Sequence, residues 1–266
     1  MVRSSGLLLA TVGVVGTLWC VGLHFVAVLP HFVGHRPLES LAGLCHLAFS
    51  VFLAHGGFYN YFKCMYTPPG SPSLSEAKEK QLESLLFNRR SAGLKDIKHN
   101  AWCRKCEKPK PKRAHHCSIC KKCILGMDHH CPWVWTCVGQ NNQKYFFLFL
   151  LYAWMGSFYG LVMMSYPFME LFIYKPWEIN ASRESIFFSW IVILFGNCAV
   201  AAMVIFQGYI ISKGKTTLEF YQSRRLAKKG AVAEQEYFNE YDHGLRKNWE
   251  IFFERKGSRC MGSLLM

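Results

Sequence analysis

Long apolar stretches separated by polar segments dominate the hydrophobic pattern of this chain. A helix needs about 20 apolar residues to cross the roughly 30 Å hydrocarbon core of a bilayer. Four stretches reach this length, and they cover residues 6–29, 41–63, 145–171 and 186–211. The second is the weakest because His46, His55 and Asn60 interrupt it, so a buried helix of a soluble protein is its alternative. The pattern predicts an all-α integral membrane protein with four transmembrane helices.

The first stretch follows Arg3, as the apolar part of a secretory signal peptide would follow a positive charge. Its apolar run is longer than that of an ordinary signal peptide, and no small-residue cleavage site followed by a polar segment is evident. We therefore expect this stretch to be a retained membrane anchor.

Positive charge is distributed unevenly between the stretches. Residues 64–144 contain fifteen lysines and arginines and residues 212–266 contain eleven, whereas the other two connections contain only one and two. Because cytosolic loops carry the excess of Lys and Arg, we expect the middle segment and both termini in the cytosol. The glycosylation sequon at Asn180 then lies on the opposite side, so close to the bilayer that we expect it to remain unmodified.

These boundaries divide the chain into four parts. Residues 1–63 hold the first two helices, and residues 145–211 hold the other two. The loop 64–144 contains a core at 102–142 that is rich in cysteine and histidine, and the tail 212–266 follows the fourth helix. We find no evident internal repeat.

The composition supports segregated apolar and basic segments rather than one soluble globule, because the chain is 51% hydrophobic yet has a formal net charge of +14. Basic loops beside anionic lipid gain about 1 kcal/mol per Lys or Arg, so contact with the bilayer explains the charge. Nucleic-acid binding is the alternative. The sequence has neither a recognition helix nor an aromatic and basic platform, so we expect no nucleic-acid partner.

Seven of the twelve cysteines lie between residues 103 and 137. They form the pattern C-x2-C, then nine residues, then H-C-x2-C-x2-C, and finally H-H-C-x5-C. Such cysteine pairs with downstream His and Cys indicate zinc, and cytosolic thiols stay reduced. Six cysteines and two histidines make two closed Cys3His sites, which leaves one cysteine over. One zinc site with spare thiols is the alternative, and spacing alone does not show which cysteine is spare.

The segment 103–142 resembles the cysteine-rich domain of the DHHC-type protein S-acyltransferases, also called protein palmitoyltransferases. Their pattern of C-x2-C, H-C-x2-C-x2-C, D-H-H-C-x5-C and a following Asn lies between the second and third of four spans. Every part of it occurs here in that order. "TTLE" at Thr216–Glu219 resembles the family motif T-T-x-E, in which Thr216 and Thr217 would connect the fourth span to the active site. "YDHGLRKNWEIFF" resembles the C-terminal motif, in which Asn248 would be a structural hydrogen-bonding asparagine.

The resemblance implies a cytosolic domain with two structural zinc ions and one nucleophile. One zinc would be held by Cys103, Cys106, His116 and Cys123, and the other by Cys117, Cys120, His130 and Cys137. Cys131 would be the nucleophile, His129 its general base and Asp128 the carboxylate that orients the base. This fits elementary chemistry, because an imidazole keeps a neighbouring thiol deprotonated for attack on a thioester. The zinc sites are closed, so we expect the metal to be structural rather than catalytic.

The resemblance also implies an acyl-CoA co-substrate, with palmitoyl-CoA as the expected species. Its acyl chain would occupy a cavity between the four helices, and its phosphates would meet the basic cytosolic face. Trp133 would lie beside the acyl carbonyl, Arg113 is a candidate for the phosphates, and Gly156 is a candidate for the cavity lining. The alternatives are interfacial anchoring for Trp133, a solvated charge for Arg113 and close helix packing for Gly156.

Two positions depart from the family pattern. Trp135-Thr136 replaces two asparagines that commonly precede the last ligand cysteine, and Pro68-Pro69-Gly70 replaces a common Asp-Pro-Gly. Neither change affects a predicted ligand or catalytic residue. We interpret Trp135 as a residue that alters either the access to Cys131 or the local contact with the membrane.

The sequence therefore predicts a protein S-acyltransferase, or palmitoyltransferase, with a two-step mechanism. Cys131 would take a fatty acyl group from acyl-CoA and pass it to cysteine thiols of membrane-proximal substrate proteins. The alternatives are a membrane-anchored zinc-binding scaffold or adaptor without catalysis, and a pseudoenzyme, which would have lost Asp128, His129 or Cys131. The expected partners are the bilayer and membrane-associated proteins with cytosolic cysteines. The expected location is the endoplasmic reticulum or Golgi, with the plasma membrane as the alternative.

Overall fold

The computed structural model describes residues 11, 15, 18–19, 21–28, 40–72, 84, 102–173, 179, 181–228 and 239–254. The chain divides into two compact units. The helical unit comprises Leu7–Lys63 and Tyr145–Gly208, and the cysteine-rich unit comprises Met1–Gly6, Cys64–Lys144 and Tyr209–Met266. Each unit therefore combines segments that are far apart in the sequence.

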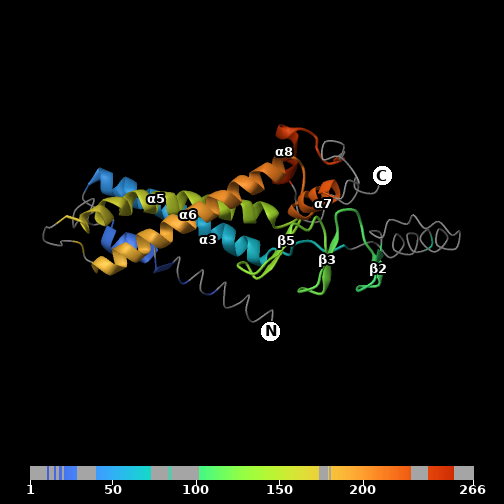
Figure 1. Cartoon of the computed structure of the whole chain (residues 1–266), viewed down its shortest axis with the longest axis horizontal. Helices are drawn as coiled ribbons and strands as arrows, with labels where there is room; N and C mark the ends of the chain where they lie inside the picture. The colour runs from blue at the N-terminus through green and yellow to red at the C-terminus, as the bar shows by residue number, and fades with distance from the viewer. Residues whose placement is uncertain are drawn as a thin grey trace. The chain divides into compact units, whose positions relative to one another are not determined.

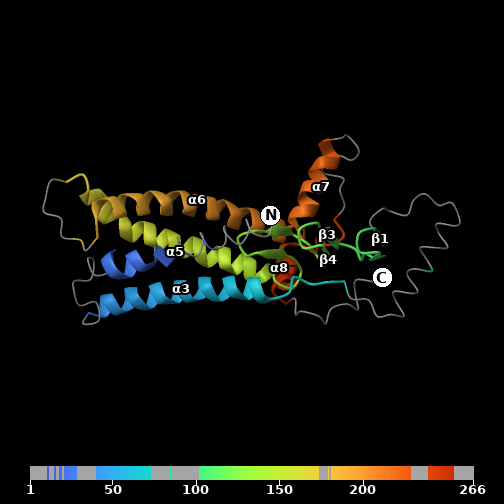
Figure 2. The same cartoon turned by 90° about the horizontal axis from the view of Figure 1, so that it is seen from below.

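Three long helices, side by side in Figures 1 and 2, build the helical unit. They are α3 (Leu41–Tyr66), α5 (Gln143–Glu170) and α6 (Arg183–Ser212). Each is long and apolar enough to cross a membrane, and each agrees with a predicted span to within about three residues at either end. Half of the first predicted span, residues 6–29, lies outside the described residues, which include the short π-helix η1 (His24–Val28) from it. The sequon at Asn180 also lies outside them.

Three polar side chains inside the helical unit form hydrogen bonds within or between its helices. Nδ1 of His46 lies 2.7 Å from the hydroxyl of Tyr159, which ties α3 to α5. Asn60 donates to the carbonyl of Gly56 at 2.8 Å. Within a bilayer an unpaired polar group costs several kcal/mol, so these bonds explain how α3 tolerates the residues that weaken its hydropathy. Asn197 likewise donates to the carbonyl of Trp154 at 3.1 Å and joins α6 to α5.

Three antiparallel hairpins form the cysteine-rich part of the other unit. They are β1 with β2 (Trp102–Cys103, Lys108–Pro109), β3 with β4 (His115–Cys117, Lys122–Ile124) and β5 with β6 (His129–Cys131, Thr136–Val138). The chain is therefore mostly helical, but the expectation of an all-α protein needs a correction at this segment. Its few apolar residues cannot build a core, and short strands that gather metal ligands replace one.

The hairpins repeat every fourteen residues, which corrects the expectation that the chain has no internal repeat. The first strand of each hairpin ends in a cysteine: Cys103, Cys117 and Cys131. Four residues later each turn has a residue with positive φ: Glu107 (52°), Lys121 (54°) and Trp135 (51°). The repeat is hard to see in the sequence because few residue types other than cysteine recur in it.

Two shorter helices, α7 (Thr217–Lys228) and α8 (Leu245–Glu254), complete the cysteine-rich unit. The buried side chain of Asn248 ties α8 to the end of α6, because its amide donates to the carbonyl of Ser212 at 2.8 Å and to Asp242 at 2.7 Å. Its oxygen accepts a hydrogen bond from the backbone N–H of His243. These contacts fit the structural role that the family resemblance implies for Asn248.

Candidate active site and metal centres

Two groups of four side chains have the composition of a structural zinc site. They are Cys103, Cys106, His116 and Cys123, and Cys117, Cys120, His130 and Cys137, with the ligand atoms of each group within 4.8 Å of one another. The sulfurs of Cys106 and Cys123 lie 3.8 Å apart, and those of Cys120 and Cys137 lie 3.5 Å apart. Tetrahedral zinc–sulfur bonds of ~2.3 Å place two sulfurs about 3.8 Å apart. Both groups therefore fit a zinc ion, and they are the two groups that the family resemblance implies.

The hairpin repeat explains how these ligands come together. Each group takes a C-x2-C pair from one hairpin, with the first cysteine at the end of its first strand and the second in its turn. It takes a His and a Cys from the two strands of the next hairpin. The His and Cys are direct cross-strand partners, His116 with Cys123 and His130 with Cys137. The second hairpin supplies ligands to both groups and so connects them.

The same repeat shows why Cys131 is the cysteine left over. It occupies the position of Cys103 and Cys117 in the third hairpin. The second turn thiol is replaced there by Val134, whose side chain is fully buried. Among residues 102–142, moreover, no fourth hairpin follows that could offer another His and Cys pair. Cys131 thus has the backbone setting of a zinc ligand without the rest of a zinc site.

Strand β5 separates the metal ligand from the other functional side chains. Successive residues of a strand point to opposite faces. His130 lies in a metal group, so His129 and Cys131 face the other way, and Cys131 hydrogen-bonds His129. Nδ1 of His129 lies 2.8 Å from Oδ2 of Asp128, a carboxylate that is completely buried. The structure therefore brings together the three residues predicted as nucleophile, base and orienting acid.

The pKa values of the acid and the base are shifted in opposite directions. Burial alone would raise the pKa of Asp128, but the hydrogen bond and positive charge of His129 and the donors of Thr217 hold it below its usual range. Burial alone would lower the pKa of His129, but hydrogen bonds to Asp128 and Cys131 and their charges raise it to about 9. The pair is therefore suited to take a proton and hold it beside a carboxylate.

The N-terminus of α7 holds the Asp128 carboxylate. The backbone N–H of Thr217 donates to Oδ1 at 2.7 Å, and its hydroxyl donates to Oδ2 at 2.7 Å. Thr216 and Glu219 form a capping box, in which the N–H of Glu219 donates to the Thr216 hydroxyl and the N–H of Thr216 donates to the Glu219 carboxylate. The cap does not use the first N–H of the helix, that of Thr217, which instead binds the Asp128 carboxylate, as helix N-termini bind anions.

Arg113 lies at this junction rather than on an open basic surface. Its Nε and Nη2 donate to the two carboxylate oxygens of Glu219 at 2.7 Å each, and Nη2 also donates to the carbonyl of Gly214. The guanidinium stacks over the ring of Tyr241. These contacts hold α7 against the loop before β3. They give Arg113 a structural role, and a contact with the CoA phosphates stays a prediction.

Sequence reasoning missed one further contact of Asp128. The buried amide of Gln143, the first residue of α5, donates to Oδ1 at 3.3 Å. Its neighbour Asn142 donates to the carbonyls of Cys137 and Cys64 at 2.9 and 3.1 Å. The asparagine that the family places after the last ligand cysteine could have indicated this contact, since it marks the point where the third hairpin joins α5.

Trp133 and Gly156 are the other two residues that the resemblance relates to the acyl group. Trp133 is half exposed, two residues beyond Cys131. Gly156 lies in α5, where an added Cβ would come no closer than 4.0 Å to Leu53. At Gly56 in α3, by contrast, an added Cβ would overlap the ring of Tyr152. Close helix packing thus explains Gly56 but not Gly156.

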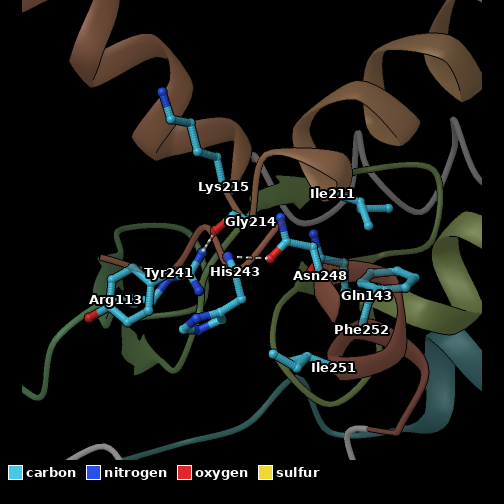
Figure 3. Close-up of a pocket in the computed structure, with 10 residues that line it drawn as sticks. All are labelled: Arg113, Gln143, Ile211, Gly214, Lys215, Tyr241, His243, Asn248, Ile251 and Phe252. Atoms are coloured by element: carbon cyan, nitrogen blue, oxygen red, sulfur yellow. Dashed lines mark hydrogen bonds between the residues drawn. The ribbon is translucent and has the colours of Figure 1, made fainter. Parts of the chain in front are cut away.

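A small pocket of about 60 Å³ lies between α8 and the segment that joins α6 to α7 (Figure 3). Its lining consists of Arg113, Gln143, Ile211, Gly214, Lys215, Tyr241, His243, Asn248, Ile251 and Phe252. None of the three predicted catalytic residues lines it. It is also far too small for a fatty acyl chain, so we do not assign acyl transfer to it.

Comparison with known proteins gives one consistent family. The DHHC palmitoyltransferase family profile matches residues 96–224. The chain is 30% identical to the probable protein S-acyltransferase 14 of Arabidopsis thaliana, covering 93% of this chain and 80% of that protein. It is 27% identical to palmitoyltransferase ZDHHC16A of Danio rerio, covering 58% of that relative, and 42% identical to human palmitoyltransferase ZDHHC3, covering 38% of it. With its two metal groups and the Asp-His-His-Cys stretch between their ligands, the chain belongs to the DHHC palmitoyltransferase family.

Proposed function

We propose that this chain is a protein S-acyltransferase that carries a fatty acyl group on Cys131. The observation that carries the proposal is the position of this thiol. Among the cysteines between residues 102 and 142, all of which the structure describes, only Cys131 lies outside the two metal groups. It hydrogen-bonds His129, whose Nδ1 lies 2.8 Å from the buried carboxylate of Asp128.

The reaction divides into two thioester exchanges. In the first, the Cys131 thiolate attacks the carbonyl carbon of the acyl-CoA thioester, the bond to the CoA sulfur breaks, and CoA leaves as a thiol after taking up a proton. In the second, a substrate cysteine attacks the acyl-Cys131 carbonyl, its thiol proton passes to His129, and Cys131 leaves as a thiolate. One thioester is exchanged for another in each step, so no oxidant or energy source is needed.

The side chains that contact His129, those of Asp128 and Cys131, act on the base and belong to neither metal group. Asp128 fixes the tautomer and ring orientation of His129, as the acid does in other triads. Zinc held by the two Cys3His groups would supply rigidity to a segment without an apolar core. His130 and Cys137 would then clamp both strands of the hairpin that carries the nucleophile.

The membrane spans support an acyl site within the helical unit. The acyl chain needs an apolar environment, and we propose that α3 and α5 supply part of it near Gly156. An added Cβ at Gly156 would meet only Leu53 of α3, at 4.0 Å, so a side chain can be added there without a clash, which supports this role. We further propose that the cysteine-rich unit and both termini face the cytosol, because Lys and Arg concentrate there. Substrates would then be membrane-proximal proteins with cytosolic cysteines, in the endoplasmic reticulum or Golgi.

Labelling with radioactive palmitoyl-CoA tests the proposal. The detergent-purified wild type should acquire hydroxylamine-sensitive label, and Cys131→Ser should acquire none while keeping its zinc. Cys198→Ser is a matched control, because Cys198 is exposed and outside both metal groups. It should label normally. Equal label on wild type and Cys131→Ser would disprove the assignment, and label on neither would favour the zinc-binding scaffold.

A further inference from the structure

The turn of the third hairpin differs in chemistry from the two turns that share its backbone. We call residues 132–135, Pro-Trp-Val-Trp, the apolar turn. The matching turns read Arg-Lys-Cys-Glu at 104–107 and Ser-Ile-Cys-Lys at 118–121. Their last residues, Glu107 and Lys121, are exposed and adopt the same positive φ as Trp135. The hairpin fold therefore tolerates a charged residue at this position and does not require tryptophan.

Trp135 places a bulky apolar side chain at an exposed position of this turn. Its side chain is 46% exposed, and that of Trp133 is 50% exposed. Its left-handed backbone is shared with Glu107 and Lys121, so the backbone is a property of the hairpin and does not explain the tryptophan. Exposed apolar patches mark interaction sites. The exposure of the two rings therefore points to an apolar environment outside the protein.

The anchoring of the third hairpin identifies that environment. Asn142 links the carbonyl of Cys137, in β6, to the carbonyl of Cys64, in the last turn of α3. Strand β6 ends at Val138, and α5 begins at Gln143. The hairpin is thus tied to the ends of two helices that can cross a membrane. The ends of such helices lie at the interface between membrane and water, where tryptophan is enriched because its ring is apolar and its N–H is polar.

We propose that Trp135 inserts into the headgroup region of the bilayer and thereby sets the height of Cys131 at the membrane surface. The partner is the phospholipid interface, not a protein. Cys131 directly precedes the apolar turn, so a fixed insertion depth places the thiol where lipid-anchored substrates and acyl-CoA arrive. This inference rests on the membrane placement in the proposed function but not on its chemistry.

A lipid photocrosslink tests the contact without requiring activity. Benzoylphenylalanine replaces Trp135, Lys121 or Glu107 in the full chain, which is reconstituted in phosphatidylcholine vesicles with a radioactive phospholipid. The probe at position 135 should give at least about threefold more lipid adduct than the matched probes at 121 and 107. Equal adduct at all three positions would overturn the proposal. So would adduct at 135 with an added substrate protein in preference to lipid.

The effect on acyl transfer from Cys131 is measured with the variants Trp135→Asn and Trp135→Phe. Asparagine suits the left-handed backbone but lacks the ring, whereas phenylalanine keeps an aromatic side chain. We expect Trp135→Asn to transfer palmitate to a vesicle-anchored cysteine peptide about three- to tenfold more slowly, with unchanged zinc content. Trp135→Phe should stay within about twofold of wild type. A wild-type transfer rate for Trp135→Asn would refute the role in setting height, whatever the crosslink shows.

Discussion

At the residue scale, Asp128 shows how one side chain can organise a site. Its carboxylate accepts hydrogen bonds from His129, from two groups of Thr217 and from Gln143, and it has no exposed surface. These donors replace the water that burial removes, so the carboxylate stays charged. The motif threonine of the tail therefore acts on His129 through Asp128.

Replacing Thr217 tests this relay. Thr217→Val keeps the backbone donor but removes the hydroxyl donor to Oδ2, and a hydrogen bond to a charged group contributes roughly 1.5–3 kcal/mol. Acylation of Cys131 should therefore slow by about 10- to 100-fold. Because the lost donor lowers the pKa of Asp128, that pKa should rise in the variant, and the acid limb of the pH–rate profile should move to higher pH. Thr217→Ser is the control and should behave like wild type, and an unshifted profile in Thr217→Val would argue against the relay.

The backbone at Trp135 predicts a gain in stability. A left-handed conformation costs an ordinary L-residue roughly 1–2 kcal/mol, and less for asparagine. Trp135→Asn should therefore raise the free energy of unfolding by about 0.5–1 kcal/mol, measured by circular dichroism during denaturation in detergent. Lys121→Asn, at the same φ in the second hairpin, should gain a similar amount. A stability loss confined to Trp135→Asn would show that contacts of the ring outweigh the backbone strain.

At the element scale, the second hairpin couples the two metal groups. It contributes His116 and Cys123 to one group and Cys117 and Cys120 to the other. Only the second group includes ligands of the hairpin that carries Cys131. The two groups should therefore differ in how strongly they affect the active site.

Single ligand substitutions test that difference. The wild type should bind about two zinc ions per chain. Cys103→Ser and Cys120→Ser should each lower that number, as measured by atomic absorption. Cys120→Ser should abolish acylation, because it frees the third hairpin, whereas Cys103→Ser should keep a reduced rate. Cys45→Ser, outside both groups, should change neither property. Equal loss of acylation in both ligand variants would mean that the groups act as one unit.

Arg113 and Lys112 give a matched pair for the junction between the hairpins and α7. The Arg113 and Glu219 side chains are only 11% and 15% exposed, whereas those of Lys112 and Glu240 are 60% and 50% exposed. Arg113→Leu leaves a largely buried carboxylate without its charged partner and should cost about 3 kcal/mol of unfolding free energy. Lys112→Leu should cost no more than about 1 kcal/mol, because exposed ion pairs are weak. Chemical denaturation followed by circular dichroism measures both, and equal effects would contradict the structural role of Arg113.

At the scale of the whole molecule, the two units divide the work. In the proposed function, the cysteine-rich unit provides the nucleophile, the base and the metal ligands, and the helical unit provides the apolar environment for an acyl chain. Gly156 is where the second role can be measured, because an added Cβ there would make only an ordinary contact with Leu53, at 4.0 Å. Gly56, by contrast, allows α3 and α5 to pack closely, since an added Cβ there would overlap Tyr152.

Substitution of Gly156 should change the acyl-chain preference. Gly156→Phe should shift acylation towards the shorter members of an acyl-CoA series of roughly 14 to 20 carbons, because the ring fills apolar space. Gly196→Phe is the control, since Gly196 is exposed on α6 and nothing lies within 4 Å of an added Cβ. The preference is read from competition between labelled acyl-CoAs. An unchanged preference in Gly156→Phe would remove this residue from the acyl site.

The sequence by itself determined the features that depend on local composition and spacing. Apolar length predicted α3, α5 and α6, because a bilayer requires about 20 consecutive apolar residues whatever the fold. The ligand types and their spacing predicted two Cys3His groups with one cysteine left over. The motif resemblance then supplied the partition of the ligands and the roles of Asp128, His129 and Cys131.

Only the tertiary structure decided which distant residues meet. It placed Thr217 and Gln143 on Asp128 and gave Arg113 a carboxylate partner, because these contacts join segments up to 106 residues apart. It also revealed three hairpins with one backbone, since backbone conformation repeats where side chains do not. That repeat gives the physical reason why Cys131 is free for chemistry: its turn has Val134 in place of a second thiol, and no further hairpin within 102–142 completes a metal site.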